Sequence, residues 1–210
     1  MTKAMTKKTS NNKYKKDRKI RIAVLVSGGG TNLQAILDAV KAKKIISGSI
    51  ELVAGFNPNA FAFERAKKNG IETYCAADEA DLLNALETRC IEFVVLAGFI
   101  KILSSDFVSH YKNRIINVHP ALIPSFCGKG CYGLHVHEKA LEKGVKVTGA
   151  TVHFVNEEPD AGKIIAQKAV LVEDGDTPES LQRRVMEEAE WQILPQTIEA
   201  VCQKILNGES

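Results

Sequence analysis

The chain has 210 residues, of which 45% are apolar and 25% charged, and these values fit one globular domain with a single core. No apolar run approaches the length of about 18 residues that a membrane helix needs, and none follows the N-terminal lysines, which predicts a cytoplasmic protein without a membrane span. Five cysteines are an odd number in such a chain, which argues against a disulfide framework and for reduced thiols.

The net charge of +3 is distributed unevenly. Residues 1–19 contain eight Lys or Arg and one Asp, a charge of +7, while the rest of the chain carries −4. Because this basic segment is polar and lacks apolar periodicity, we interpret it as a disordered tail rather than as an arm that binds nucleic acid. We therefore expect the folded domain to cover residues 20–210.

Apolar runs alternate with helical patterns in the first half of this domain. The first run, residues 20–26, stops at three glycines, and a helical pattern begins at Thr31. Similar runs follow at residues 51–56, 71–76 and 91–99, separated by helical patterns at 59–70 and 78–90. Strands that alternate with helices predict a parallel sheet with right-handed crossovers, and continuously apolar strands predict burial on both faces. The fold class is therefore α/β, with a single doubly wound, mostly parallel sheet flanked by helices.

The second half of the domain has a different pattern. Residues 146–155 and 163–172 are two further strand-like runs separated by the turn sequence NEEPDAG. Thr177 is a suitable N-cap with Pro178 at the first helical position, so we expect one long helix from there to residue 205. Trp191 and a stripe of aliphatic residues on this helix are expected in the core, with most glutamates on other faces.

The glycine-rich segment 27–33 (SGGGTNL) joins the first strand to the first helix. Free backbone N–H groups at a helix N-terminus form an anion site, so a phosphate is the expected ligand. Leu33 takes the place of the third glycine of the dinucleotide fingerprint, and no Gly-Lys-Ser/Thr follows, which favours a single phosphate over a dinucleotide or a P-loop nucleotide. The alternative is a tight turn that only packs the helix on the sheet.

A polar pair ends another apolar run at residues 115–120 (IINVHP). Side chains alternate along a strand, so Asn117 and His119 should share one face at the carboxyl end, where open α/β sheets bind ligands. An amide and an imidazole can both donate to an oxygen that becomes negative, and His119 can also move a proton. Asp160 would favour and orient the imidazolium if it lay near His119; otherwise it is a solvated residue of an acidic turn.

The segment CGKGCYGLHVH contains two thiols and two imidazoles of the types that zinc prefers. These residues are Cys127, Cys131, His135 and His137. The C-x₃-C and H-x-H spacings differ from the usual zinc patterns, and the glycines favour a loop, so a metal site is the weaker interpretation.

The ordered series of motifs VLVSGGGTNLQAI, VVLAGFIKILS, RIINVHPALIPSF, GLHVHEKALEKG, VTGATVHFV and DAGKIIAQ resembles the folate-dependent phosphoribosylglycinamide formyltransferases, from Arg21 to about Ala200. The resemblance implies a Rossmann-like formyltransferase fold and transfer of formyl from 10-formyltetrahydrofolate to the amine of glycinamide ribonucleotide in purine biosynthesis. It implies no metal, no nucleic-acid or membrane partner, and a monomer or homodimer.

The resemblance also assigns roles to individual residues. It implies a catalytic trio of Asn117, His119 and Asp160, in which Asp160 raises the pKa of the histidine. It places the substrate phosphate at Gly30, Thr31 and Asn32, and the amine-bearing substrate near Glu190. The pterin of the folate would be lined by Ile100, Lys101, Ile102 and Leu103, with Asn117 also contacting it.

Alternative functions remain open from the sequence. Formyltetrahydrofolate deformylase and methionyl-tRNA formyltransferase share an Asn, His and Asp site, but we expect each to need an additional domain that this chain does not contain. From other classes, a non-catalytic module, either zinc-stabilised or nucleotide-binding, would use Cys127, Cys131, His135 and His137. A dehydrogenase is disfavoured by Leu33 and by Asn57, which stands where an acidic residue would hold the ribose.

Overall fold

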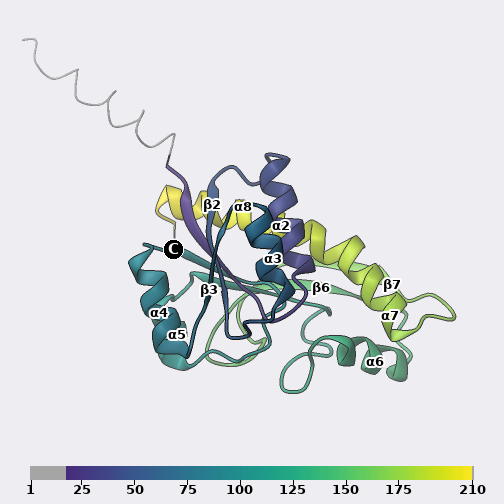
Figure 1. Cartoon of the computed structure of the whole chain (residues 1–210). Coiled ribbons are helices and arrows are strands. Elements are labelled where there is room, and N and C mark those ends of the chain that lie inside the picture. Colours follow the sequence, from purple (N-terminus) through teal and green to yellow (C-terminus); the bar gives the residue numbers. More distant parts are fainter. Residues whose placement is uncertain (1–17, 210) are drawn as a thin grey trace, which may run out of the picture.

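The computed structural model describes residues 18–209, and Figure 1 shows one sheet between layers of helices. The tail predicted over residues 1–19 therefore lies outside the described residues, apart from its last two. Within the described part the sheet has seven strands in the order β3-β2-β1-β4-β5-β6-β7. Their bounds are β1 Ile20–Leu25, β2 Gly48–Gly55, β3 Glu72–Cys75, β4 Phe93–Leu96, β5 Ile115–His119, β6 Val147–Phe154 and β7 Ile164–Leu171.

The pairing of the strands confirms the predicted doubly wound, mostly parallel sheet. Strands β1 to β5 pair in parallel, whereas β6 pairs antiparallel with both β5 and β7. The chain order runs from β1 outward to β2 and β3, then returns to the other side of β1 with β4. This reversal between β1 and β4 is a topological switch point, where the ends of adjacent strands leave a crevice for a ligand.

The helices cover both faces of the sheet. Their bounds are α2 Thr31–Lys41, α3 Phe61–Lys68, α4 Glu79–Thr88, α5 Ser105–His110, α6 Leu134–Lys143, α7 Pro178–Val185, the π-helix η1 Met186–Glu190, and α8 Trp191–Asn207. One buried cluster joins α2, α3, α7 and α8 to the sheet, and a second cluster joins α4 and α5 to the opposite face. Alternate residues of β1 supply the two clusters, as Val24 and Leu25 show, because successive strand side chains point to opposite faces.

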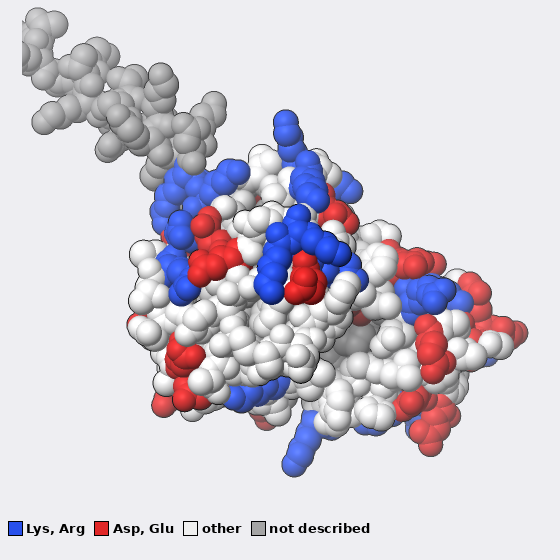
Figure 2. Space-filling view, in the orientation of Figure 1, with Lys and Arg blue, Asp and Glu red and all other residues white. Residues whose placement is uncertain are grey.

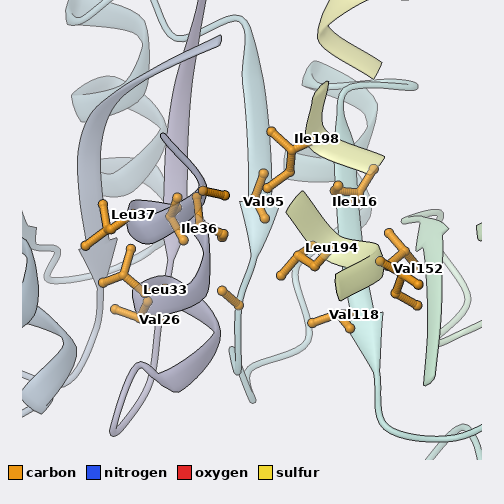
Figure 3. Close-up of a cluster of buried hydrophobic side chains, with 14 of the residues drawn as sticks. Val26, Leu33, Ile36, Leu37, Val95, Ile116, Val118, Val152, Leu194 and Ile198 are labelled. Atoms are coloured by element: carbon orange, nitrogen blue, oxygen red, sulfur yellow. The ribbon is translucent and has the colours of Figure 1, made fainter. Parts of the chain in front are cut away.

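Figure 3 shows how the larger cluster is assembled. Leu33 and Ile36 of α2 and Leu194 and Ile198 of α8 pack over side chains of the central strands such as Val95. All of these side chains are fully buried. Burial of a side chain of this size stabilises the fold by roughly 1.5–3 kcal/mol, which fixes both the start of α2 and the C-terminal helix against the sheet. The glycine loop before α2 is thereby held in a fixed position.

Three helical features differ from the expectations. The short helix α5 and the helix α6 were not predicted as helices, the first because it spans only six residues and the second because it follows the glycine-rich segment 128–133. The predicted long helix from Thr177 does begin there, with Thr177 and Ser180 forming a capping box, but it is interrupted by η1 before α8. In a π-helical turn each hydrogen bond spans one residue more than in an α-helix. The side chains after the turn therefore point in different directions from those that an uninterrupted α-helix would give them.

The surface carries charges of both signs. On the face shown in Figure 2, Lys and Arg side chains lie among Asp and Glu side chains rather than forming one continuous basic field. Several of them are paired, for example Arg21 with Glu51 at 3.3 Å and Lys67 with Glu64 at 3.2 Å. None of the described helices is long and apolar enough to span a membrane.

Candidate active site

A pocket of about 780 Å³ lies at the carboxyl ends of β1, β4 and β5. Its walls come from the glycine loop after β1, the segment after β4, the end of β5, the loops around residues 128–133 and 155–160, and the π-helix. The pocket therefore sits at the topological switch point of the sheet. All the residues expected in the site, including Asn117, His119, Asp160 and Glu190, line it.

His119 and Asp160 are brought together from distant parts of the chain. The Nδ1 atom of His119 lies 3.6 Å from Oδ2 of Asp160, and their side chains are only 4% and 14% exposed. The Nε2–H of His119 donates to the carbonyl oxygen of Phe126 at 2.9 Å, which assigns the proton to that nitrogen because a carbonyl can only accept. The backbone N–H of Gly128 donates to Asp160 at 2.8 Å. The loop at residues 126–128 thus contacts both members of the pair.

His153 is a site residue that the sequence analysis missed. It pairs with Asn117 across the antiparallel strands β5 and β6, and its Nε2 lies 3.3 Å from Nδ2 of Asn117 and 3.6 Å from Oδ1 of Asp160. Its Nδ1–H donates to the Phe154 carbonyl at 2.8 Å, so Nε2 is free to accept from the Asn117 amide. His153 therefore fixes the amide with its nitrogen toward the ring and leaves a second N–H for another acceptor. Its position at the end of a strand, just before the NEEPDAG turn, was the available signal.

The electrostatics of His119 correct one expectation. Burial lowers the pKa of His119, and it outweighs the opposing effects of the Asp160 carboxylate and the Phe126 carbonyl, so the net pKa is below the usual value. We expected Asp160 to raise this pKa; it does act in that direction, but the low-dielectric surroundings dominate. For Asp160 itself, burial raises the pKa, but the contact with His153, the hydrogen bond from the Gly128 N–H and the charge of His119 together bring it below the ordinary value. Asp160 is therefore an anion beside a mostly neutral imidazole.

The glycine loop is held at the pocket with its backbone accessible. Gly30 has φ of +73°, and a Cβ at this position would come within 2.7 Å of the Ala62 Cβ, so the loop requires glycine here. Around Gly28 and Gly29 no described atom lies within 4 Å of an added Cβ, which leaves the backbone approachable from the pocket. The loop is held from outside by Arg65, whose Nε donates to the Gly29 carbonyl at 2.8 Å. These contacts place the N-terminus of α2 at the pocket wall.

Asn32, at the start of α2, and Glu190, at the end of the π-helix, form a buried pair beside the glycine loop. The Asn32 Nδ2 donates to the Glu190 carboxyl at 2.5 Å, and only 5% of Glu190 is exposed. Burial raises the pKa of Glu190 to about 7, against the opposing effect of the Asn32 hydrogen bond. The expectation that glutamates on this helix are solvated is therefore wrong for Glu190, because the π-helical turn ends at this residue and directs it inward. The Oδ1 of Asn32 has no protein partner among the described residues.

The segment after β4 forms an apolar wall of the pocket. Ile100 and Ile102 are 61% and 62% exposed, whereas Leu103 is buried, so the segment presents aliphatic side chains at the pocket rim. Lys101 turns away toward a neighbouring ring and carboxylate: its Nζ lies 4.0 Å from the centre of the Phe56 ring and 3.8 Å from Glu79. The Ile100 N–H is held by the Ser27 hydroxyl at 3.0 Å, which ties this wall to the glycine loop.

The four possible zinc ligands are not gathered into one site. Within residues 18–209 no group of three or more His, Cys, Asp or Glu side chains has a metal-binding arrangement. His135 pairs instead with Glu138 at 2.7 Å, and Cys131 accepts a hydrogen bond from Lys139. His137 is fully buried in the pocket wall with both ring nitrogens unpartnered among the described residues. Burial and the nearby His119 lower the pKa of His137 to about 4, so it stays neutral at neutral pH.

This fold and site define an α/β enzyme with one pocket in which a helix N-terminus lies beside a buried imidazole, carboxylate and amide. A helix N-terminus can bind an anion, and the three side chains can donate hydrogen bonds and move a proton at a carbonyl carbon. The chain belongs to the formyl transferase family, since the sequence model of that family matches residues 20–198.

Individual relatives agree with this assignment. The chain is 41% identical over 175 residues to phosphoribosylglycinamide formyltransferase of Escherichia coli, covering 79% of this chain and 80% of the relative. It is 42% identical over 193 residues to the chicken trifunctional purine biosynthetic protein adenosine-3, covering 88% of this chain but only 18% of that protein.

Solved structures show the same similarity. The crystal structure of glycinamide ribonucleotide transformylase 1 from Symbiobacterium toebii superposes with a TM-score of 0.81 at 38% identity, covering 88% of each chain. A formyltetrahydrofolate deformylase from Pseudomonas syringae superposes with a TM-score of 0.75 at 26% identity, covering 87% of this chain and 62% of the other. The predicted fold and family are therefore confirmed, and the deformylase is the more distant neighbour in sequence.

Proposed function

We propose that this protein transfers the formyl group of 10-formyltetrahydrofolate to the amine of glycinamide ribonucleotide, as the family and the relatives' names indicate. The observation that carries the assignment is one pocket that joins an anion-binding helix N-terminus to a buried histidine, carboxylate and amide. A phosphorylated amine substrate needs the first feature, and formyl transfer between two nitrogens needs the second. A deformylase would transfer the formyl group to water and would have no use for the phosphate subsite.

The reaction requires stabilisation of one oxygen and movement of one proton. The substrate amine attacks the formyl carbon, and the carbonyl oxygen becomes negative as the carbon turns tetrahedral. The free N–H of Asn117 donates to this oxygen, while His153 holds the amide in that orientation. The C–N bond to the folate then breaks, and the proton lost by the attacking amine ends on the folate nitrogen.

The protonation of His119 changes as negative charge develops on the substrate oxygen. A neutral imidazole beside Asp160 can accept a proton, and the developing oxyanion favours the imidazolium because an opposite charge raises the pKa of His119. The proton held on the His119 imidazolium can then stabilise the oxyanion and afterwards be passed to the leaving folate nitrogen. The fixed negative charge of Asp160 stabilises the His119 imidazolium in this buried site.

The two ends of the pocket suit the two substrates. We assign the ribonucleotide phosphate to the backbone of Gly30, Thr31 and Asn32 and the substrate amine to the Glu190 side, where a carboxyl can accept its hydrogen bonds. The flat pterin fits the aliphatic wall between Ile100 and Leu103 and the Asn117 end of β5. Formyl folate is in this scheme a co-substrate, and no step requires a metal.

The direct test is an assay that follows loss of formyl from a 10-formyl folate with and without glycinamide ribonucleotide. Turnover that depends on the ribonucleotide supports the transferase, and turnover without it would identify a deformylase instead. His119→Ala should lower kcat by about 10²-fold or more with little change in KM, the usual scale for a group that acts in the transition state. His135→Ala is the matched control, because that side chain is exposed and bound to Glu138. Near-normal turnover of His119→Ala would refute the assigned role.

A further inference from the structure

The loop at residues 126–131 connects the catalytic pair to two cysteines. The Phe126 carbonyl accepts from His119, and the Gly128 N–H donates to Asp160. Cys127 lies between these two backbone contacts, and Cys131 lines the same pocket three residues beyond Gly128. Any constraint on this short loop is therefore transmitted directly to the two side chains that handle the proton.

Both thiols are free and only partly buried within the described part of the chain. The Cys131 sulfur accepts a hydrogen bond from the Lys139 ammonium at 3.2 Å, and the same ammonium donates to the Gly130 carbonyl at 3.2 Å. The Lys139 ammonium is thus in direct contact with the Cys131 sulfur, and the deprotonated form of a thiol is the one that reacts with an oxidant. The Cys127 thiol instead donates to the Pro124 carbonyl at 3.3 Å and is the resolving partner in this arrangement.

The backbone between the two cysteines is a tight turn. The Cys131 N–H donates to the Gly128 carbonyl at 3.0 Å, which closes a turn over residues 128–131 and brings Cys131 back toward Gly128, the neighbour of Cys127. A disulfide needs a Cα separation of about 4.4–6.8 Å, so the loop has to rotate until the Cα atoms of Cys127 and Cys131 lie within that range. Gly128 and Gly130, with φ of +83° and +79°, have no described atom within 4 Å of an added Cβ, so there is open space beside these two residues.

We propose that Cys127 and Cys131 form a reversible disulfide that switches off formyl transfer by shifting the loop whose backbone holds His119 and Asp160. A peroxide is the oxidant. The Cys131 thiolate attacks one peroxide oxygen, the O–O bond breaks, and a sulfenic acid and water result; the Cys127 thiol then attacks the sulfenic sulfur and releases a second water. Two thiols lose two electrons and two protons in total, and the peroxide is reduced to two waters. The effect on activity rests on the proposed function, whereas formation of the disulfide does not.

The remaining cysteines do not share these features. Cys202 is fully buried, and burial raises the pKa of its thiol to about 12, so it is unreactive. Cys75 and Cys90 are exposed but belong to the end of β3 and the segment after α4, outside the pocket. They provide an internal comparison of thiols that can meet an oxidant but have no neighbouring catalytic group.

The test is to treat the full chain with hydrogen peroxide, block the remaining thiols by alkylation, and map the disulfides by peptide mass spectrometry. We expect a peptide linking Cys127 to Cys131 and a loss of formyl transfer of about 10-fold or more. A dithiol reductant should reverse both changes, which separates the disulfide from methionine sulfoxide or higher sulfur oxides.

Single serine variants supply the controls. Cys127→Ser and Cys131→Ser should each keep, after peroxide, most of the activity that the same variant has when reduced, and Cys75→Ser should be inactivated like the unmodified chain. Absence of the linked peptide at full oxidation of the exposed thiols would refute the disulfide, and a linked peptide with unchanged turnover would refute the switch. The peptide map is independent of turnover, so failure of the proposed function would be recognised separately by an inactive reduced enzyme.

Discussion

The buried carboxyl of Glu190 makes a strong prediction about the pH dependence of stability. Burial raises its pKa from 4.5 to about 7 in the folded chain. The folded state therefore holds one more proton than the unfolded state between pH 4.5 and 7, and stability contributed by this group falls as the pH rises through that window. Above pH 7 the loss is complete. Between pH 5 and pH 8 the change should amount to about 2–3 kcal/mol, since each pKa unit corresponds to about 1.4 kcal/mol.

Glu190→Gln should remove this contribution, because the amide keeps the shape of the side chain without its titration. The measurement is the free energy of unfolding in urea at pH 5 and pH 8 for both chains without substrates. We expect the variant to gain stability relative to the unmodified chain as the pH rises, by roughly the difference worked out above. Glu187→Gln is the matched control on the same π-helix, because that side chain is exposed. An identical pH dependence in the unmodified chain and Glu190→Gln would show that Glu190 is not the buried acid described.

Two further predictions concern the glycine loop and the proton-transfer pair. Gly30→Ala should destabilise the fold by about 1–3 kcal/mol and raise KM for the ribonucleotide, because Gly30 has a positive φ and an added Cβ would contact Ala62. Gly28→Ala should cost less than about 0.5 kcal/mol, because an added Cβ has open space there. Urea unfolding of both variants is the measurement, and equal losses of stability would refute the packing argument. Asp160→Asn removes the charge that favours the imidazolium, so an NMR titration should find the pKa of His119 lower than in the unmodified chain, together with a kcat reduced by about 10²-fold. An unchanged or higher pKa would contradict the electrostatics derived for the pair.

The local pattern of the sequence determined much of the fold. Apolar runs alternating with helical segments predict a parallel sheet, and three glycines before Thr31 predict a tight backbone turn, in which Gly30 has no room for a side chain. The two-residue period of a strand placed Asn117 and His119 on one face before any contact was known. These features depend on neighbours in the chain, so the residue types alone carry the information.

The identity of the other site residues depended on contacts between distant segments. Asp160 and His153 reach the pocket only because β6 pairs antiparallel with β5, and sequence periodicity does not specify which strands pair. The inward direction of Glu190 follows from one π-helical turn, whose hydrogen bonds differ from an α-helix by a single residue.

The sequence by itself thus determined the alternation of strands and helices in the first half of the domain, the glycine turn before Thr31, and the candidate side chains Asn117, His119 and Asp160. The tertiary structure alone decided which of those side chains meet and in which protonation state. The lowered pKa of His119 illustrates the reason: the sequence supplied a carboxylate that raises it, but burial, which lowers it more, exists only once the surrounding strands and loops have excluded water.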